Sequence, residues 1–249
     1  LLIALVVIGV CAAVAWWAFR PAPAAQEENG AGVSAQSTTL PLFERVVVSG
    51  RVGATPTIEI KAPLEVDGSK ATTLVKGDGR EITEGSPVLV AITAFYVETG
   101  QTLSEFGRPQ LSLGIVGTDV IGEDLTNMVI GQQEGSRLIA FRTIAPGAGA
   151  PGSTSNVEVD VIDILPSIAV GTAVDASVGP LSVEINPNGP IITHGSTVPD
   201  GVTTQMLIKG DGVQVHESDR VVAQFTALGW TDGVVRVSTW ETGVPQVIN

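Results

Sequence analysis

The residues of this sequence that could do acid–base or nucleophilic chemistry are few and stand apart. The two histidines, His194 and His216, lie in loop-like or strand-edge contexts, with no Ser or Cys nucleophile motif beside either. A general base must lie within hydrogen-bond reach of the proton that it removes, so we interpret both histidines as solvated residues. Neither an H-E-x-x-H motif nor a Walker loop occurs. The sequence therefore predicts no catalytic side chain of these kinds.

Metal and cofactor sites also find little support in the sequence. The single cysteine, Cys11, can form neither an intrachain disulfide nor a cysteine metal cage. Asp78 lies in Gly77-Asp78-Gly79, where a short carboxylate is typical of a turn residue that accepts nearby backbone N–H groups. The glycines of residues 147–152 are followed by no helical pattern that could cradle a phosphate. We expect no metal and no cofactor.

The Gly-Asp-Gly turn belongs to a segment that the sequence contains twice. Lys76, which precedes the turn, returns as Lys209, 133 positions later and again before Gly-Asp-Gly. A period of this length indicates tandem domains, because solenoid repeats run roughly 20–50 residues. We predict two copies of one domain, residues 43–166 and residues 167–249, with the second copy incomplete at its C-terminal end.

Composition argues against some partners and favours a β-rich fold. The 249 residues carry 13 basic and 26 acidic side chains, a formal net charge of −13. This charge argues against nucleic acid and against an anionic membrane surface as partners. The 29 glycines and 15 prolines, together with abundant Val and Thr, are typical of short strands joined by many turns.

The beginning of the sequence indicates a membrane or export segment. Residues 1–19 carry no charge and are nearly all apolar, about the length that crosses a bilayer. Residues 1–20 are thus either a retained transmembrane anchor or a signal peptide cut near Ala22-Pro23-Ala24. The first alternative makes a single-pass protein of the cell membrane with extracytoplasmic domains, and the second a secreted protein. Residues 21–42, rich in Pro, Ala, Gly, Ser and Glu, are expected to form a flexible linker.

Strand-like and helical patterns predict the elements of the first domain. Apolar and polar residues alternate over Thr57–Ile60 and Val157–Val161, the period of a half-buried strand, and Val88–Val97 predicts a long strand. A helix is expected over Gly122–Ile130, because two acidic residues fall in its first turn and Gly131 follows it. Many strands around one short helix predict an α+β domain.

Together these segments resemble an FKBP-type peptidyl-prolyl cis-trans isomerase in a tandem, exported, actinobacterial-like arrangement. The resemblance rests on the Gly77-Asp78-Gly79 turn and its second copy, on Ile130–Arg137, on the hairpin Trp230–Trp240 and on the strand Val157–Leu165. It implies a curved antiparallel β-sheet wrapped around one short helix, in a tandem of which the second copy ends before its helix, behind the N-terminal transmembrane or signal helix.

The family's proline pocket is only partly matched. The resemblance implies a Tyr on the first long strand, where the two copies hold Ile92 and Phe225, and a Phe-Asp pair, where the first copy holds Thr102-Leu103. Leu125 fits the helix position of the pocket. The predicted pocket residues are Ile92, Leu103, Val120, Ile121, Leu125, Phe225 and Trp240.

Two functions follow from the resemblance. Rotation about an X-Pro bond crosses a barrier of roughly 18–20 kcal/mol, which a pocket that fits the twisted amide lowers without any nucleophile. One function is thus an exported prolyl isomerase that assists the folding of extracytoplasmic proteins, with activity mainly in a complete second domain. The other is an FKBP-like peptide-binding, chaperone or structural module that has lost catalysis. The expected partners are proline-containing polypeptides and, through residues 1–20, the membrane, but not nucleic acid.

Overall fold

The computed structural model describes residues 40–97, 108–144, 157–174, 181–186, 189–212, 214–217, 219 and 221–248. The chain divides into a unit of residues 1–39 and a unit of residues 40–249, and all the described residues belong to the second unit. Within this unit we describe separately a first region, residues 40–167, and a second region, residues 172–248.

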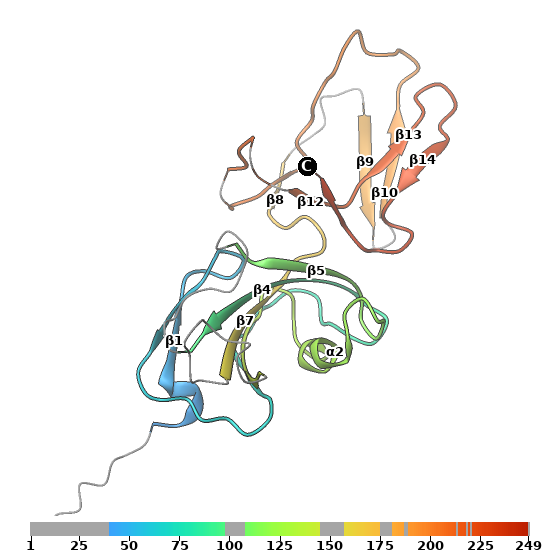
Figure 1. Cartoon of the computed structure of the whole chain (residues 1–249). Coiled ribbons are helices and arrows are strands. Elements are labelled where there is room, and N and C mark those ends of the chain that lie inside the picture. Colours follow the sequence, from blue (N-terminus) through green and yellow to red (C-terminus); the bar gives the residue numbers. More distant parts are fainter. Residues whose placement is uncertain are drawn as a thin grey trace, which may run out of the picture. The chain divides into compact units, whose positions relative to one another are not determined.

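The first region is built on a five-stranded antiparallel sheet with the strand order β3-β6-β7-β4-β5 (Figure 1). Its strands are β3 (Lys70–Val75), β4 (Pro87–Tyr96), β5 (Gln110–Ile115), β6 (Arg137–Thr143) and β7 (Val157–Leu165). The last of these in the sequence, β7, lies in the centre of the sheet and pairs with both β6 and β4. The long strand predicted from the run of apolar residues after Pro87 is confirmed as β4.

Helix α2 packs on one face of this sheet. It spans Glu123–Val129, as predicted, and its first turn carries Glu123 and Asp124. It ends just before Gly131, whose φ of 76° suits glycine. The buried side chains on this face form the first core, which consists of Ile82, Val88, Val90, Val116, Ile121, Val129, Leu138, Ala140, Ile162 and Ile164.

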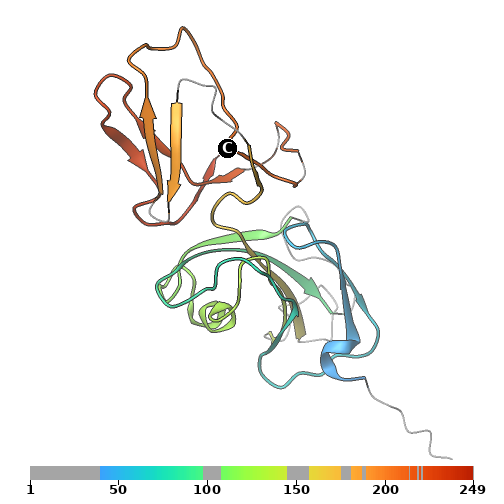
Figure 2. The same ribbon diagram turned by 180° about the vertical axis from the view of Figure 1, so that it is seen from behind.

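A hairpin covers the other face of the sheet. Strands β1 (Val46–Ser49) and β2 (Thr57–Ile60) pair antiparallel after the 3₁₀ turn η1 (Leu42–Arg45). The second core on this face consists of Val46, Leu64, Phe95, Ile139, Phe141, Val157, Val159 and Val161. Figures 1 and 2 show the hairpin and α2 on opposite sides of the sheet. Because both faces are packed, the central strands are rich in Val and Ile on both sides.

A buried ion pair of the sheet forms hydrogen bonds with the connection between β1 and β2. Arg137 of β6 and Asp163 of β7 are direct cross-strand partners, with side chains 2% and 4% exposed. Arg137 donates from Nε to Asp163 Oδ1 at 2.6 Å and from Nη2 to Oδ2 at 2.7 Å. It also donates to the carbonyls of Gly50 and Arg51 at 2.6 and 2.8 Å, and the N–H of Gly53 donates to Asp163 Oδ2 at 2.7 Å. Such additional hydrogen bonds are what makes a buried ion pair tolerable.

The repeated Gly-Asp-Gly turn makes a close backbone contact in the first region. The N–H of Gly77 donates to Ser136 Oγ at 2.9 Å, and the N–H of Gly79 donates to the carbonyl of Glu134 at 3.0 Å. A Cβ on Gly77 would overlap the backbone at Glu134, so this position needs glycine. In the second region a Cβ added to the matching Gly210 would come no closer than 3.9 Å to the carbonyl oxygen of Val170.

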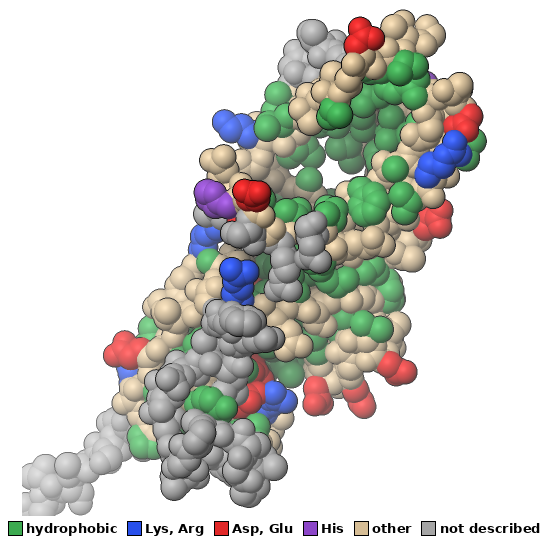
Figure 3. Space-filling model, turned by 45° about the horizontal axis from the view of Figure 1, so that its top comes forward, with side chains coloured by type: hydrophobic (Ala, Val, Ile, Leu, Met, Phe, Trp, Pro, Cys, Tyr) green, Lys and Arg blue, Asp and Glu red, His purple; other side chains and the backbone are tan. Residues whose placement is uncertain are grey.

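The second region consists of four two-stranded antiparallel sheets, which pair β8 with β11, β9 with β10, β12 with β15 and β13 with β14. The strands are β8 (Thr172–Ala173), β9 (Leu181–Asn186), β10 (Gly189–His194), β11 (Ile208–Lys209), β12 (Val221–Ala223), β13 (Thr226–Leu228), β14 (Val235–Ser238) and β15 (Gln246–Ile248). Large apolar side chains remain exposed here, among them Val202 at 100% and Met206 at 61%. Figure 3 shows hydrophobic side chains at the surface.

The repeat matches β12 and β15 of the second region to β4 and β5 of the first. The described residues of the second region form no α-helix and no sheet of more than two strands. They provide no counterpart of β6 and β7, the strands that link β3 to β4 in the first region.

The predicted fold class is wrong in the transmembrane helix that it places before the domains. Within the described ranges no helix is long and apolar enough to cross a membrane, and the single α-helix found there, α2, has seven residues. Residues 1–20, on which the prediction falls, lie outside the described residues, as do residues 21–39 of the predicted linker. The domain boundaries and the extracytoplasmic location stay predictions.

Candidate binding site

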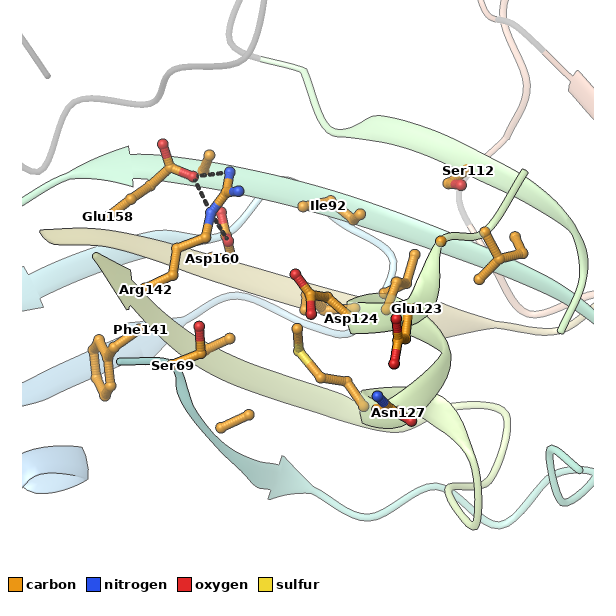
Figure 4. Close-up of a pocket in the computed structure, with 18 of the residues that line it drawn as sticks. Ser69, Ile92, Ser112, Glu123, Asp124, Asn127, Phe141, Arg142, Glu158 and Asp160 are labelled. Atoms are coloured by element: carbon orange, nitrogen blue, oxygen red, sulfur yellow. Dashed lines mark hydrogen bonds and ion pairs between the residues drawn. The ribbon is translucent and has the colours of Figure 1, made fainter. Parts of the chain in front are cut away.

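A cavity of about 740 Å³ lies between α2 and the sheet of the first region. All five strands of the sheet and the helix contribute residues to its lining (Figure 4). A helix of seven residues is about 10 Å long, whereas the ten residues of β4 extend over about 33 Å. The helix therefore covers only part of the sheet, and the pocket opens beside it.

One end of the pocket is apolar. Ile92 of β4 and Ile162 of β7 are direct cross-strand partners and both line the cavity. Ile121 before the helix, and Leu125 and Met128 on it, complete this end. These five residues are called the apolar end below. They offer a surface on which a bound apolar group would gain roughly 25 cal/mol for each Å² that it buries.

The other end of the pocket is charged and continues along the same strands. Asp160 of β7 has Ala94 of β4 and Ala140 of β6 as its direct cross-strand partners. The next position on this face pairs Glu158 of β7 with Arg142 of β6. Side chains alternate along a strand, so both carboxylates face the side of the sheet on which α2 lies. Arg142, Glu158 and Asp160 are called the charged end below.

The side chains of the charged end are joined through Arg142. Its Nε donates to Glu158 Oε1 at 2.7 Å and lies 3.1 Å from Asp160 Oδ2, and its Nη2 also pairs with Glu158 Oε1. The Arg142 side chain is 54% exposed, whereas those of Glu158 and Asp160 are 9% and 10% exposed. Figure 4 shows the three side chains gathered at one end of the pocket, with Glu123 and Asp124 on the helix.

The surroundings shift the acidity of two of these groups. Burial and, after it, the nearby Glu158 raise the pKa of Asp160 to about 7, although Arg142 acts in the opposite direction. Burial acts to lower the pKa of Arg142, but the carboxylates of Asp160 and Glu158, with a contribution from Asp124, raise it above its ordinary value. Arg142 therefore stays charged, whereas Asp160 changes its charge near neutral pH.

One atom of the charged end has no hydrogen-bond partner. Asp160 Oδ1 is buried, and no donor of the described residues reaches it. Leaving a buried acceptor unsatisfied costs about 1–3 kcal/mol, and more for a charged group. The pocket thus contains an acceptor to which a bound molecule could donate.

The structure brings together three of the predicted pocket residues. Ile92, Ile121 and Leu125 all line the cavity. Val120 is not among the lining residues, and its side chain is 69% exposed. Leu103 lies outside the described residues.

The two pocket residues predicted in the second copy do not line this cavity. Phe225 follows β12, and its N–H donates to Thr239 Oγ1 at 2.9 Å. Trp240 follows β14 and packs against Gly189, where an added Cβ would come within 2.8 Å of the ring. Both side chains are half-buried within the second region.

Sequence reasoning missed the charged end of the pocket and Met128. The alternation Val157-Glu158-Val159-Asp160 is visible in the sequence, but it was interpreted only as a strand with one polar face. Arg142 could have indicated the charged end. It lies on the strand before β7 and provides a cation for the two acidic residues that share one face of β7. In the parts of the chain that the structure describes, no group of three or more His, Cys, Asp or Glu side chains could hold a metal ion.

Comparisons with known proteins show a weak similarity to a solved structure. No protein-family model matches the chain, and no curated protein matches it. Among the solved structures, FkpA from Escherichia coli matches with a TM-score of 0.27 and 16% sequence identity. The match covers 40% of this chain and 47% of the FkpA chain, so less than half of FkpA is spanned.

Proposed function

We propose that this chain is a folding helper of the FKBP type, with prolyl isomerase or chaperone-like activity, and that its first region binds proline-containing polypeptides. The observation that carries this proposal is the pocket between α2 and the sheet, with Ile92, Ile121 and Leu125 at its apolar end. These residues were predicted from the family's proline pocket. A proline ring is a compact apolar group, so burying it against them supplies binding energy without any covalent chemistry.

Within this function, the first region acts mainly by binding. Catalysis requires the pocket to fit the twisted amide of the transition state better than either planar form. The strand position where the family has a Tyr holds Ile92, which provides neither a ring nor a hydroxyl. We therefore propose weak isomerisation by the first region, and the assignment of the main isomerase activity to a complete second domain stays a prediction.

The test is a binding titration of the whole chain with two short peptides that differ only by Pro or Ala after a Leu. We expect the Pro peptide to bind more tightly and to shift the methyl resonances of the apolar end. Ile92→Thr should lower the affinity for the Pro peptide about tenfold, because it removes apolar contact area from the pocket. The matched control is Ile168→Thr, which makes the same change at a side chain that is 47% exposed.

Two results would contradict the proposal. One is the absence of any binding, or binding that shifts resonances of the second region alone. The other concerns catalysis: acceleration of X-Pro isomerisation that disappears with Ile92→Thr and matches a fully active prolyl isomerase would show that the first region is the main enzyme. We expect at most a small acceleration.

A further inference from the structure

The charged end of the pocket has more negative than positive groups. Across the cavity lining, four carboxylates come from Glu123, Asp124, Glu158 and Asp160, whereas Lys70 and Arg142 are the cations. Arg142 is shared between two of the carboxylates. The formal charge of the lining is therefore negative, and it becomes more negative when Asp160 ionises.

The unpaired oxygen lies where a long side chain could reach it. Asp160 Oδ1 is buried without a partner, while Oδ2 of the same carboxylate already faces Arg142. The cross-strand neighbours of Asp160 are Ala94 and Ala140, and Ala71 of β3 is in turn the partner of Ala140. All four residues line the cavity. This part of the floor is therefore flat and apolar, apart from one acceptor.

Such a floor suits an apolar stem that ends in a hydrogen-bond donor with a positive charge. A lysine or arginine side chain has this construction, because its methylene groups pack on apolar surface while its head group donates to a carboxylate. We propose that the charged end is a subsite for a lysine or arginine side chain of the bound polypeptide. This inference rests on the proposed polypeptide-binding function and names the class of sequence that the pocket prefers.

A basic side chain fits the chemistry better than an acidic or a neutral one. An acidic side chain would meet Glu158 and Asp160 in a poorly solvated site, where repulsion between like charges costs several kcal/mol. A neutral alkyl chain would pack on the alanines but would leave Asp160 Oδ1 unsatisfied. The ammonium or guanidinium group supplies both the missing donor and the opposite charge.

Proton linkage supports the same assignment. A cation beside Asp160 favours the ionised carboxylate, so binding should release a proton when the solution pH is below about 7. The charged groups that face this site are Lys70 on β3, Arg142 on β6, Glu158 on β7, and Glu123 and Asp124 on α2. The lining residues from β4 and β5 are Ile92, Ala94, Gln110 and Ser112, which do not titrate.

The experiment compares three peptides that differ at one position next to the proline. The position carries lysine, norleucine or glutamate, and each is tested both before and after the proline. Norleucine keeps the alkyl stem of lysine without its charge. Calorimetric titration of the whole chain at low salt and about pH 8.5, where Asp160 is mostly ionised, gives the three affinities.

We expect the lysine peptide to bind about tenfold more tightly than the norleucine peptide in at least one position, as one charged hydrogen bond implies. Asp160→Asn should remove this preference, so that the lysine and norleucine peptides bind the variant with equal affinity. The matched control is Glu59→Gln, which removes the same charge at an exposed residue of β2, on the hairpin that covers the other face of the sheet. At about pH 5.5 the preference should be about threefold or less, because Asp160 is then protonated.

The outcomes separate this inference from the function on which it rests. If the norleucine peptide binds as tightly as the lysine peptide in both positions, or Asp160→Asn keeps the preference, the basic subsite is wrong and polypeptide binding stands. If no peptide binds, both proposals are wrong. If Asp160→Asn unfolds the chain, Glu158→Gln at the next pair of the same face provides the test, and an unchanged lysine preference in that variant overturns the subsite.

Discussion

The two arginines of β6 each face an acidic residue of β7, but they do so on opposite faces of one sheet. Arg137 pairs with Asp163 on the face covered by the β1–β2 hairpin, and Arg142 pairs with Glu158 on the face of α2. The Arg137 pair is almost completely buried, whereas the side chain of Arg142 is 54% exposed. The same residue types on the same two strands therefore experience different environments.

The two clusters differ in how many of their donors and acceptors have a hydrogen-bond partner. Arg137 and Asp163 make two parallel hydrogen bonds and use their remaining groups on the backbone of the β1–β2 connection. In the other cluster, Arg142 serves two carboxylates and leaves Asp160 Oδ1 without a donor. A buried ion pair whose hydrogen bonds are all satisfied is tolerated within a fold, whereas the unsatisfied oxygen of Asp160 costs stability.

The largest effect is expected from breaking the complete pair. Arg137→Met should lower the free energy of unfolding by about 3–5 kcal/mol, because it leaves the Asp163 carboxylate buried without its cation. Urea unfolding of the whole chain, followed by circular dichroism, measures the loss. The double variant Arg137→Met with Asp163→Leu should recover a part of it, since no unpaired charge then remains. A loss below about 1 kcal/mol in the single variant would contradict this assignment.

Asp160→Asn is expected to raise the free energy of unfolding above neutral pH. The folded state raises the pKa of Asp160 from 3.8 to about 7, so it binds the proton more tightly than the unfolded chain does. Stability contributed by this group is therefore lost as pH rises from about 4 to about 7. Asparagine cannot ionise, so the variant should be about 1–3 kcal/mol more stable than the parent at about pH 8. Denaturation curves across this range should converge near pH 4, and a constant difference would count against the raised pKa.

A smaller effect is expected from removing the exposed arginine. Arg142→Met should lower the free energy of unfolding by about 1–2 kcal/mol, less than Arg137→Met, because water reaches the 54% exposed Arg142 side chain and weakens its pairs with the nearly buried Glu158 and Asp160. The same substitution should raise the pKa of Asp160 further, since Arg142 is the group that opposes its rise. A carboxyl ¹³C titration by NMR follows this pKa directly. A pKa that falls in the variant would show that Arg142 does not act on Asp160 in solution.

The smallest effect is expected from salt, which should separate the two clusters without any further mutation. Raising the salt concentration to about 1 M shortens the screening length to about 3 Å. The stability difference caused by Arg142→Met should then shrink to a few tenths of a kcal/mol, while that caused by Arg137→Met should stay the same within error. Equal sensitivity of both differences to salt would mean that the Arg137 pair is open to solvent.

The sequence could predict β2, β4, β7 and α2 of the first region and three of the five residues at the apolar end of its pocket. The helix was located by its acidic first turn and by Gly131, and both signals are local. Ile92, Ile121 and Leu125 were found together because their motif positions were matched in order. Residue order and local chemistry are enough for such predictions, since strands and short helices are encoded over a few residues.

The charged end and the second region could not be predicted in the same way. The alternation of β7 shows that Glu158 and Asp160 share a face, but their burial depends on what lies opposite that face. The repeat aligns β12 and β15 with β4 and β5, and both pairs of strands are antiparallel. The further pairs β8–β11 and β9–β10 were not predicted.

The position of β7 has a consequence for how the first region is made. A chain is synthesised from its N-terminus, and contacts between distant segments must wait for the later one. The strand that joins both halves of the sheet, β7 between β6 and β4, is the last to leave the ribosome or a translocation channel. Until Val157–Leu165 has emerged, β4 and β6 expose the edges and apolar faces that this strand will cover. During its own synthesis the first region therefore passes through the aggregation-prone condition that a folding helper would relieve in other chains.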